Sequence, residues 1–187
     1  MNPIEQQFFT DLEKKLWTAA DKLRSSLDAS VYKHVVLGLI FLKYVSDAFE
    51  ERQNELRAQF QNPEHDYYMD PAEYGGASTP EYEENIAAEL EVRDYYTEKN
   101  VFWVPAIARW DFIKDNAKVA VDTVLQVKNG TTYDYKFKGI GRLLDDALEA
   151  VEKENPKLKN VLDKSYARWR VDEALPGLID EFSKIPF

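Results

Sequence analysis

One long stretch of apolar residues at helical spacing constrains the fold more than any other feature. Between positions 31 and 49, apolar side chains recur every three or four residues, which places them along one face of an α-helix. We therefore predict a helix over about 29–61, capped by Asp28 or Ser30. A second apolar stripe runs beside the first, so this helix should be buried at the centre, and its polar second half (50–55) should extend into solvent. The two stripes are Val31, Val35, Leu39, Leu42, Val45 and Phe49, and then Tyr32, Val36, Ile40 and Tyr44.

Weaker signals predict shorter elements on both sides of this central helix. Residues 62–79 hold prolines and glycines among polar residues and should form a long loop. Alternating residues over 125–137, around Asn129-Gly130, indicate a β-hairpin that packs on the helices. The fold class is therefore mainly α, a helical bundle with a small β-hairpin. The other predicted helices cover about 2–27, 80–98 (capped by Thr79), 105–118, 141–154 and 172–184, with an extended stretch at 101–105.

The charge is unevenly distributed along the 187 residues. The net charge is −10, and residues 62–100 contribute −9 of it, with 11 acidic and 2 basic side chains. Such a chain is not expected to bind nucleic acid tightly by electrostatics alone. There is no cysteine, which excludes disulfides and thiolate metal sites. With neither a signal peptide nor an apolar run long enough to span a bilayer, the chain is expected to be cytoplasmic, with no membrane contact.

The motifs that usually carry chemistry are weak or incomplete here. Gly139-x-Gly141 begins like a dinucleotide fingerprint, but Leu144 stands where a third glycine is needed. A turn into the following helix explains the pair better. Asp145, Glu149 and Glu152 share one side of that helix. We interpret them as a solvated face, and a small carboxylate enzyme is the least favoured hypothesis.

Two clusters combine aromatic and basic side chains, a composition that suits either nucleic-acid stacking or a buried core with arginines at its edge. We favour the core interpretation and keep a nucleic-acid or partner surface as the alternative. The clusters are Trp103, Arg109 and Trp110, and Tyr166, Arg168, Trp169 and Arg170.

Several blocks of sequence occur together in an order that resembles one known family. They are residues 16–24 (LWTAADKLR), 32–37 (YKHVVL), 41–47 (FLKYVSD), 101–105 (VFWVP) with 108–110 (ARW), 140–147 and 150–156. This pattern is similar to the amino-terminal helical domain of HsdM, the modification subunit of type I restriction-modification systems. The resemblance covers nearly the whole chain. Residues 119–138 are longer than the family pattern and are interpreted as a possible hairpin insertion.

The resemblance implies a role within a larger enzyme. The family's modification subunit transfers a methyl group from S-adenosylmethionine to the exocyclic N6 amine of adenine in duplex DNA. Its partners are a specificity subunit (HsdS), an endonuclease subunit (HsdR) and a second HsdM copy. The catalytic domain holds a glycine-containing cofactor motif and an Asn-Pro-Pro-Tyr/Phe loop, and neither occurs here. No catalytic, cofactor-binding or metal residue is therefore transferred to this chain, and the catalytic domain is expected after residue 187.

We thus interpret residues 1–187 as one assembly and DNA-clamp domain. Its candidate contacts with DNA or partner subunits are Arg24, Lys33, Lys43 and Arg109. The alternative is a free-standing helical protein-interaction module without a catalytic role.

Overall fold

The computed structural model describes residues 28–185 and the single positions 10, 14 and 18. Apart from those three positions, the helix predicted over 2–27 lies outside the described residues. Helices predominate and one antiparallel hairpin accompanies them, which confirms the predicted fold class. In chain order, with η for 3-10 helices, the elements are α2 (Ala29–Phe60), η1 (Pro71–Tyr74), α3 (Pro80–Glu89), α4 (Asp94–Thr97), η2 (Ala106–Ala108), α5 (Trp110–Asn116), β1 (Val124–Asn129), β2 (Thr131–Lys136), α6 (Ile140–Glu154), η3 (Pro156–Leu158), α7 (Tyr166–Trp169) and α8 (Leu175–Phe182).

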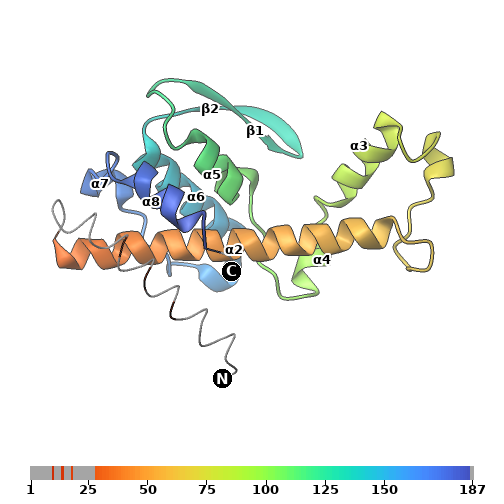
Figure 1. Cartoon of the computed structure of the whole chain (residues 1–187), viewed down its shortest axis with the longest axis horizontal. Helices are drawn as coiled ribbons and strands as arrows, with labels where there is room; N and C mark the ends of the chain where they lie inside the picture. Colours follow the sequence, from red (N-terminus) through yellow and green to blue (C-terminus); the bar gives the residue numbers. More distant parts are fainter. Residues whose placement is uncertain (1–9, 11–13, 15–17, 19–27, 186–187) are drawn as a thin grey trace.

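The long helix α2 organises the molecule, as the sequence predicted. It runs along the length of the structure, with α5, α6, α8 and the hairpin over its first half and α3 beside its second half (Figure 1). We call residues 50–100 the arm, and residues 28–49 together with 101–185 the body.

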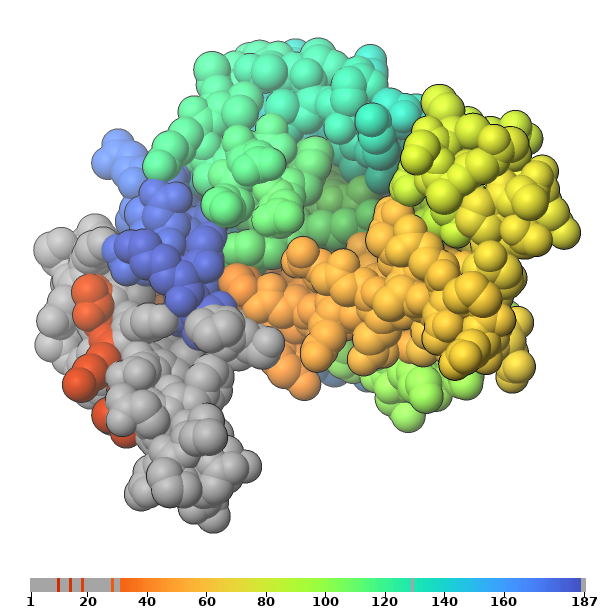
Figure 2. All heavy atoms as spheres, turned by 45° about the vertical axis from the view of Figure 1, so that its right-hand side comes forward, coloured from red at the N-terminus to blue at the C-terminus, as the bar shows by residue number. Residues whose placement is uncertain are grey.

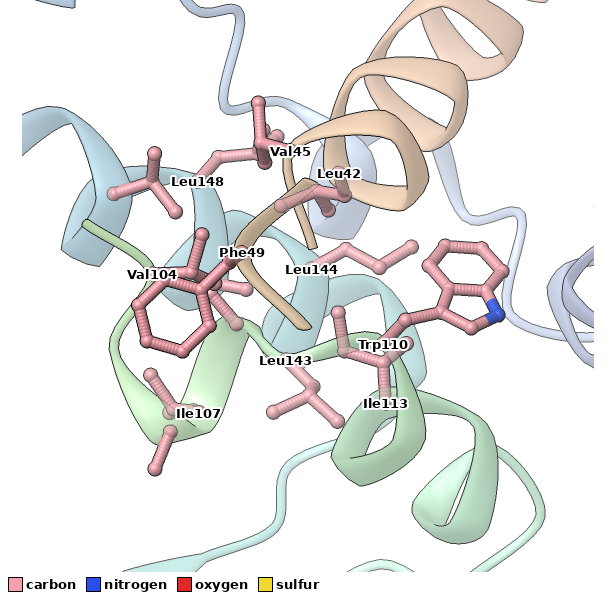
Figure 3. Packing of buried hydrophobic residues seen from close by; sticks show 14 of the residues in the cluster. Leu42, Val45, Phe49, Val104, Ile107, Trp110, Ile113, Leu143, Leu144 and Leu148 are labelled. Atoms are coloured by element: carbon pink, nitrogen blue, oxygen red, sulfur yellow. The ribbon is translucent and has the colours of Figure 1, made fainter. Parts of the chain in front are cut away.

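The core of the body lies between α2, α6 and the segment 103–113. Figure 3 shows Leu42 and Val45 of α2 facing Leu144 and Leu148 of α6, with Ile113 of α5 nearby. All five side chains are buried. The predicted main stripe of α2 is confirmed, because Val35, Leu39, Leu42, Val45 and Phe49 are all buried and Val31 is partly buried. The neighbouring stripe is less buried than predicted, and Tyr44 is exposed.

Two predicted helices are interrupted in the structure. The helix predicted over 80–98 is divided into α3 and α4, and the Tyr96 hydroxyl donates a hydrogen bond to the Leu90 carbonyl across the gap (2.6 Å). The helix predicted over 105–118 is divided at Arg109, which has an extended backbone. There Ser46 Oγ accepts the Trp110 N–H (2.7 Å) and so caps α5 from α2. The break at Arg109 thus depends on a residue distant in sequence, whereas the contact across the gap near 90 is local.

The C-terminal part differs from the prediction in a similar way. The predicted helix over 141–154 is confirmed as α6, whereas the last helix, α8, is shorter than the predicted 172–184. The single turn α7 was not predicted. It has four residues and ends at Arg170 in a left-handed conformation (φ 56°), so its sequence carries little helical periodicity.

The predicted hairpin is confirmed in position. Strands β1 and β2 pair from Val124↔Lys136 to Asn129↔Thr131, and Gly130 occupies the apex with a left-handed φ of 72°. Leu125, Val127 and the following Phe137 are buried, and β1 contacts η2. The hairpin therefore packs on the body. That residues 119–138 are an insertion stays a prediction.

The second half of α2 is less solvated than predicted. Arg52, Leu56 and Phe60 are buried, because the arm folds back along the helix. The Arg52 Nε donates a hydrogen bond to the Tyr95 carbonyl (3.0 Å), and the Phe60 and Tyr95 rings meet edge-on with centroids 5.6 Å apart. The second half of α2, although mostly polar in sequence, therefore packs against the rest of the arm along one side.

Candidate assembly and DNA-contact surfaces

The predicted contact residues fall into different environments. Lys33 is exposed on the first turns of α2. Lys43 is buried and forms an ion pair with Asp47 one turn later. Arg24 lies outside the described residues. The role of all four residues in DNA or partner contact stays a prediction.

Arg109 connects the body to the arm. Its Nη2 donates to both carboxylate oxygens of Glu91 (2.8 and 2.9 Å), and its Nε donates to the Val104 carbonyl (3.2 Å). The guanidinium also lies 4.9 Å from the centre of the Phe49 ring. A bidentate pair with a cation–π contact holds the side chain in one geometry. This arginine acts first as a structural link between the two regions.

The interpretation of Asp145 as a solvated carboxylate is wrong. Asp145 is 8% exposed, and its two oxygens accept the backbone N–H groups of Tyr166 (2.8 Å) and Ala167 (3.0 Å). Burial raises the pKa of the carboxyl above its ordinary value of 3.8, against the lowering effect of these hydrogen bonds. The carboxylate thus fastens the start of α7 to α6. Since α7 was not predicted, the sequence pattern could not show what covers this acid.

The neighbouring carboxylates serve other structural contacts. Asp146 accepts the Tyr135 hydroxyl (2.7 Å) and pairs with Arg142 (2.8 Å). Glu152 pairs with Lys164 at 2.9 Å, which lowers the pKa of Glu152. Glu149 is exposed. These acids point to different partners and do not form a paired acid–base site.

The segment around Gly139 and Gly141 is filled by the chain itself. An added Cβ on Gly139 would lie 2.7 Å from an oxygen of Asp172, and the N–H of Gly141 donates to the same carboxylate (3.0 Å). A nucleotide phosphate would need the place that this carboxylate occupies at the start of α6. The residues present therefore do not fit a nucleotide cofactor, and the pair forms a turn into α6.

The two aromatic–basic clusters differ in burial. Trp103 and Trp110 are core residues, 4% and 5% exposed. In the second cluster Tyr166 is also buried, and its hydroxyl donates to the Val35 carbonyl (2.6 Å). Trp169 is half-buried, with its ring 6.0 Å from that of His34. Arg168 and Arg170 are exposed beside it. The core interpretation holds for both tryptophans of the first cluster.

A group of lysines at the end of α6 belongs to no recognisable sequence motif. Lys153, Lys159 and Lys164 line an open hollow of about 430 Å³, and Lys157 lines a second hollow of about 210 Å³. Pro156 lines both hollows, so they adjoin. The signal was present as a run of lysines between 153 and 164, but only the fold shows that they share one edge of the molecule.

The arm carries the acidic surface. Figure 2 shows residues of this region as a lobe at one side of the molecule. Its acidic side chains are mostly exposed, and Arg57 pairs with Glu83 across α2 and α3 (2.9 Å). Aromatic contacts such as Tyr67 with Tyr95 (5.1 Å) fill its interior. The arm and the lysines at the end of α6 thus present opposite charges to a partner.

Comparison with known proteins identifies the family. The family model of the HsdM N-terminal domain matches residues 12–182. This chain belongs to that family. It is similar to the type I restriction enzyme MjaIX methylase subunit of Methanocaldococcus jannaschii, with 32% identity over 179 residues, which are 95% of this chain and 27% of that protein. It is also similar to the type I restriction enzyme HindI methylase subunit of Haemophilus influenzae, with 34% identity over 84 residues, 45% of this chain and 18% of that protein.

The chain therefore spans about a quarter of the length of the first relative. Within the described residues, no helix is long and apolar enough to cross a membrane. No group of three or more histidine or carboxylate side chains there is placed to hold a metal ion.

Proposed function

We propose that this HsdM N-terminal domain is the assembly and DNA-clamp domain of a type I adenine-specific DNA methyltransferase subunit. The observation that carries the proposal is the match over 95% of the chain to a subunit whose name specifies a type I restriction enzyme methylase. The domain positions other subunits around duplex DNA and performs no chemistry itself.

The hydrogen bonds of buried and partly buried polar side chains support a structural role for this domain, with the chemistry placed elsewhere in the protein. Three polar side chains of the body, those of Asp145, Asp172 and Asn155, are each engaged by backbone groups. Asn155 holds Trp103 from both sides, since it accepts the Trp103 N–H (3.0 Å) and donates to the Trp103 carbonyl (2.9 Å). These bonds make the body a rigid platform, and a rigid platform suits docking.

The whole protein is proposed to use S-adenosylmethionine as the donor and the N6 amine of adenine as the acceptor. The filled glycine turn at α6 supports placing the cofactor outside these residues. The partners are a specificity subunit, which selects the DNA sequence, a second modification subunit and an endonuclease subunit. Contacts by Lys33 and Arg109 in that assembly are part of the proposal.

The test is complex formation with the specificity subunit of the same type I system. The chain is mixed with duplex DNA, first alone and then with that subunit, and the complexes are sized by light scattering after gel filtration. We expect a complex of defined stoichiometry and tighter DNA binding when the subunit is present. If the subunit changes neither size nor affinity, the assembly role is wrong and a free-standing interaction module takes its place.

A further inference from the structure

A local excess of positive charge lies at the end of α6 and in the segment that follows it. Eighteen residues, 153–170, hold six basic and two acidic side chains in a chain whose net charge is −10. Lys153, Lys157 and Lys159 are exposed, and no ion pair within the described part of the chain involves them. We call these three residues the lysine edge.

Most carboxylates beside the lysine edge are already neutralised. Glu154 pairs with Arg93, and Glu152 pairs with Lys164 (2.9 Å). Glu149, which lines the same hollow as Lys153 and Lys159, is the exception and is exposed. Three lysines and the one carboxylate of Glu149 therefore leave the lysine edge with a net positive charge.

The lysine edge stands on a fixed backbone. Leu158 is buried between the exposed Lys157 and Lys159, so the two ammonium groups extend outward from an anchored turn. The residue before the turn, Asn155, is buried, and its amide also donates to the Val151 carbonyl (2.7 Å). Cations on an anchored turn keep their spacing when a ligand arrives, which reduces the entropy lost on binding.

We propose that the lysine edge binds the phosphate backbone of duplex DNA. Lysine is a point charge that contacts phosphate oxygens without reading bases, and the hollow of about 430 Å³ is wide and open enough for a phosphodiester segment. Asn160 lines the same hollow and adds an amide donor. The contact positions the domain on DNA and carries no sequence preference. The choice of DNA as the polyanion rests on the proposed function.

The main experiment compares two double variants with equal charge change. Lys157→Gln with Lys159→Gln removes two cations of the lysine edge. Lys114→Gln with Lys128→Gln is the matched control, because both lysines are exposed and lack ion pairs in the described part of the chain. Binding of the whole chain to a duplex of about 30 base pairs is measured by fluorescence anisotropy from about 25 to 200 mM salt.

We expect the lysine-edge variant to bind about tenfold more weakly at low salt and to lower the slope of log affinity against log salt by about 2. The control should keep the slope of the natural chain. Equal slopes in both variants, or no binding by the natural chain at the lowest salt, would overturn the proposal.

A second measurement needs no variant. The chain is acetylated on lysine with and without the duplex, and the products are read by mass spectrometry. The duplex should protect Lys153, Lys157 and Lys159 from acetylation and leave the acetylation of Lys114 and Lys128 unchanged. Polyglutamate is the competitor that separates DNA from an acidic protein surface. Displacement of the duplex by polyglutamate at equal charge, or self-association that the lysine-edge variant abolishes, would overturn the choice of DNA.

The outcome is separable from that of the proposed function. The lysine-edge variant should still join the specificity subunit, since the substitution removes only DNA contacts. Failure of the natural chain to join that subunit rejects the proposed function, whereas an unchanged salt slope in a variant that does join rejects the lysine edge alone.

Discussion

The body and the arm are held together by different kinds of interaction. In the body, side chains from distant parts of the sequence meet in one apolar core, as Leu42 and Leu144 do, and buried polar groups fasten the connections. In the arm, aromatic rings and hydroxyl groups provide many of the contacts, such as the Tyr82 hydroxyl with the Met69 carbonyl (3.2 Å). The body should therefore unfold as one unit, whereas the arm can open locally.

This difference bears on function. Acidic side chains cover the arm, and we expect its local opening to let it adjust to a partner. The body holds the lysine edge on an anchored turn. One domain thus combines an adaptable acidic surface with a fixed basic one.

The largest effect is expected from truncating one buried leucine in each region and comparing how each variant unfolds. Leu144→Ala in the body should lower the free energy of unfolding by roughly 2–5 kcal/mol, because a fully buried leucine leaves a cavity. Leu90→Ala in the arm should mainly raise amide exchange over 62–100. Urea denaturation and hydrogen exchange measure the two effects. Equal exchange changes throughout the chain after Leu90→Ala would contradict a separately opening arm.

Asp145→Asn should lower the free energy of unfolding by about 1–3 kcal/mol, because an amide cannot accept both N–H groups of α7. Exposed Glu149→Gln is the control.

The same variant carries a signature in its pH dependence. Burial raises the pKa of Asp145 in the folded state above 3.8, so the folded chain retains this proton to higher pH than the unfolded chain. The contribution of this group to stability therefore falls as pH rises from the unfolded pKa through the folded pKa. Thermal melts at a series of acidic pH values should show this fall in stability with rising pH in the natural chain and not in Asp145→Asn. The same dependence in both chains would show that another group causes it.

Tyr82→Phe tests the arm with a smaller change. It removes only the hydroxyl that donates to the Met69 carbonyl, and the expected cost is about 0.5–1.5 kcal/mol. Hydrogen exchange should report the loss within the arm, with no change in α6. Tyr68→Phe is the matched control, as no hydrogen bond in the described part of the chain involves the Tyr68 hydroxyl. A loss of protection in α6 would mean that body and arm are coupled.

The smallest effect is expected from Arg57→Gln. The Arg57–Glu83 pair is about half exposed on both sides, and such pairs contribute about 0–1 kcal/mol. Denaturation at low and high salt should show a small difference that high salt removes. A loss well above 1 kcal/mol would make this bridge a principal support of the arm.

Much of the fold follows from local sequence patterns. The apolar spacing of α2 and α6, the Thr79 cap of α3 and the Asn-Gly hairpin turn were all predictable. The Thr79 hydroxyl indeed accepts the Tyr82 N–H (3.3 Å). Each of these signals acts between residues close in sequence, which is why a single sequence reveals them.

Three of the misses share one cause. The helix break at 109, the burial of Asp145 and the structural use of Arg109 depend on partners from other segments. Apolar periodicity shows which face of a helix is buried, but not which distant backbone will cover a carboxylate. The lysine edge was missed for the same reason. The spacing of its lysines in the sequence does not show that the adjacent carboxylates, Glu152 and Glu154, pair with Lys164 and Arg93.

The sequence by itself determined the helical class, the central helix, the hairpin and the resemblance that the family comparison confirmed. The tertiary structure alone decided that Asp145 and Asp172 fasten the chain to itself, and that Lys153, Lys157 and Lys159 share one exposed edge. The physical reason is range: helical periodicity and turn preferences operate over a few residues, whereas burial and charge neutralisation depend on which distant segments the core brings together.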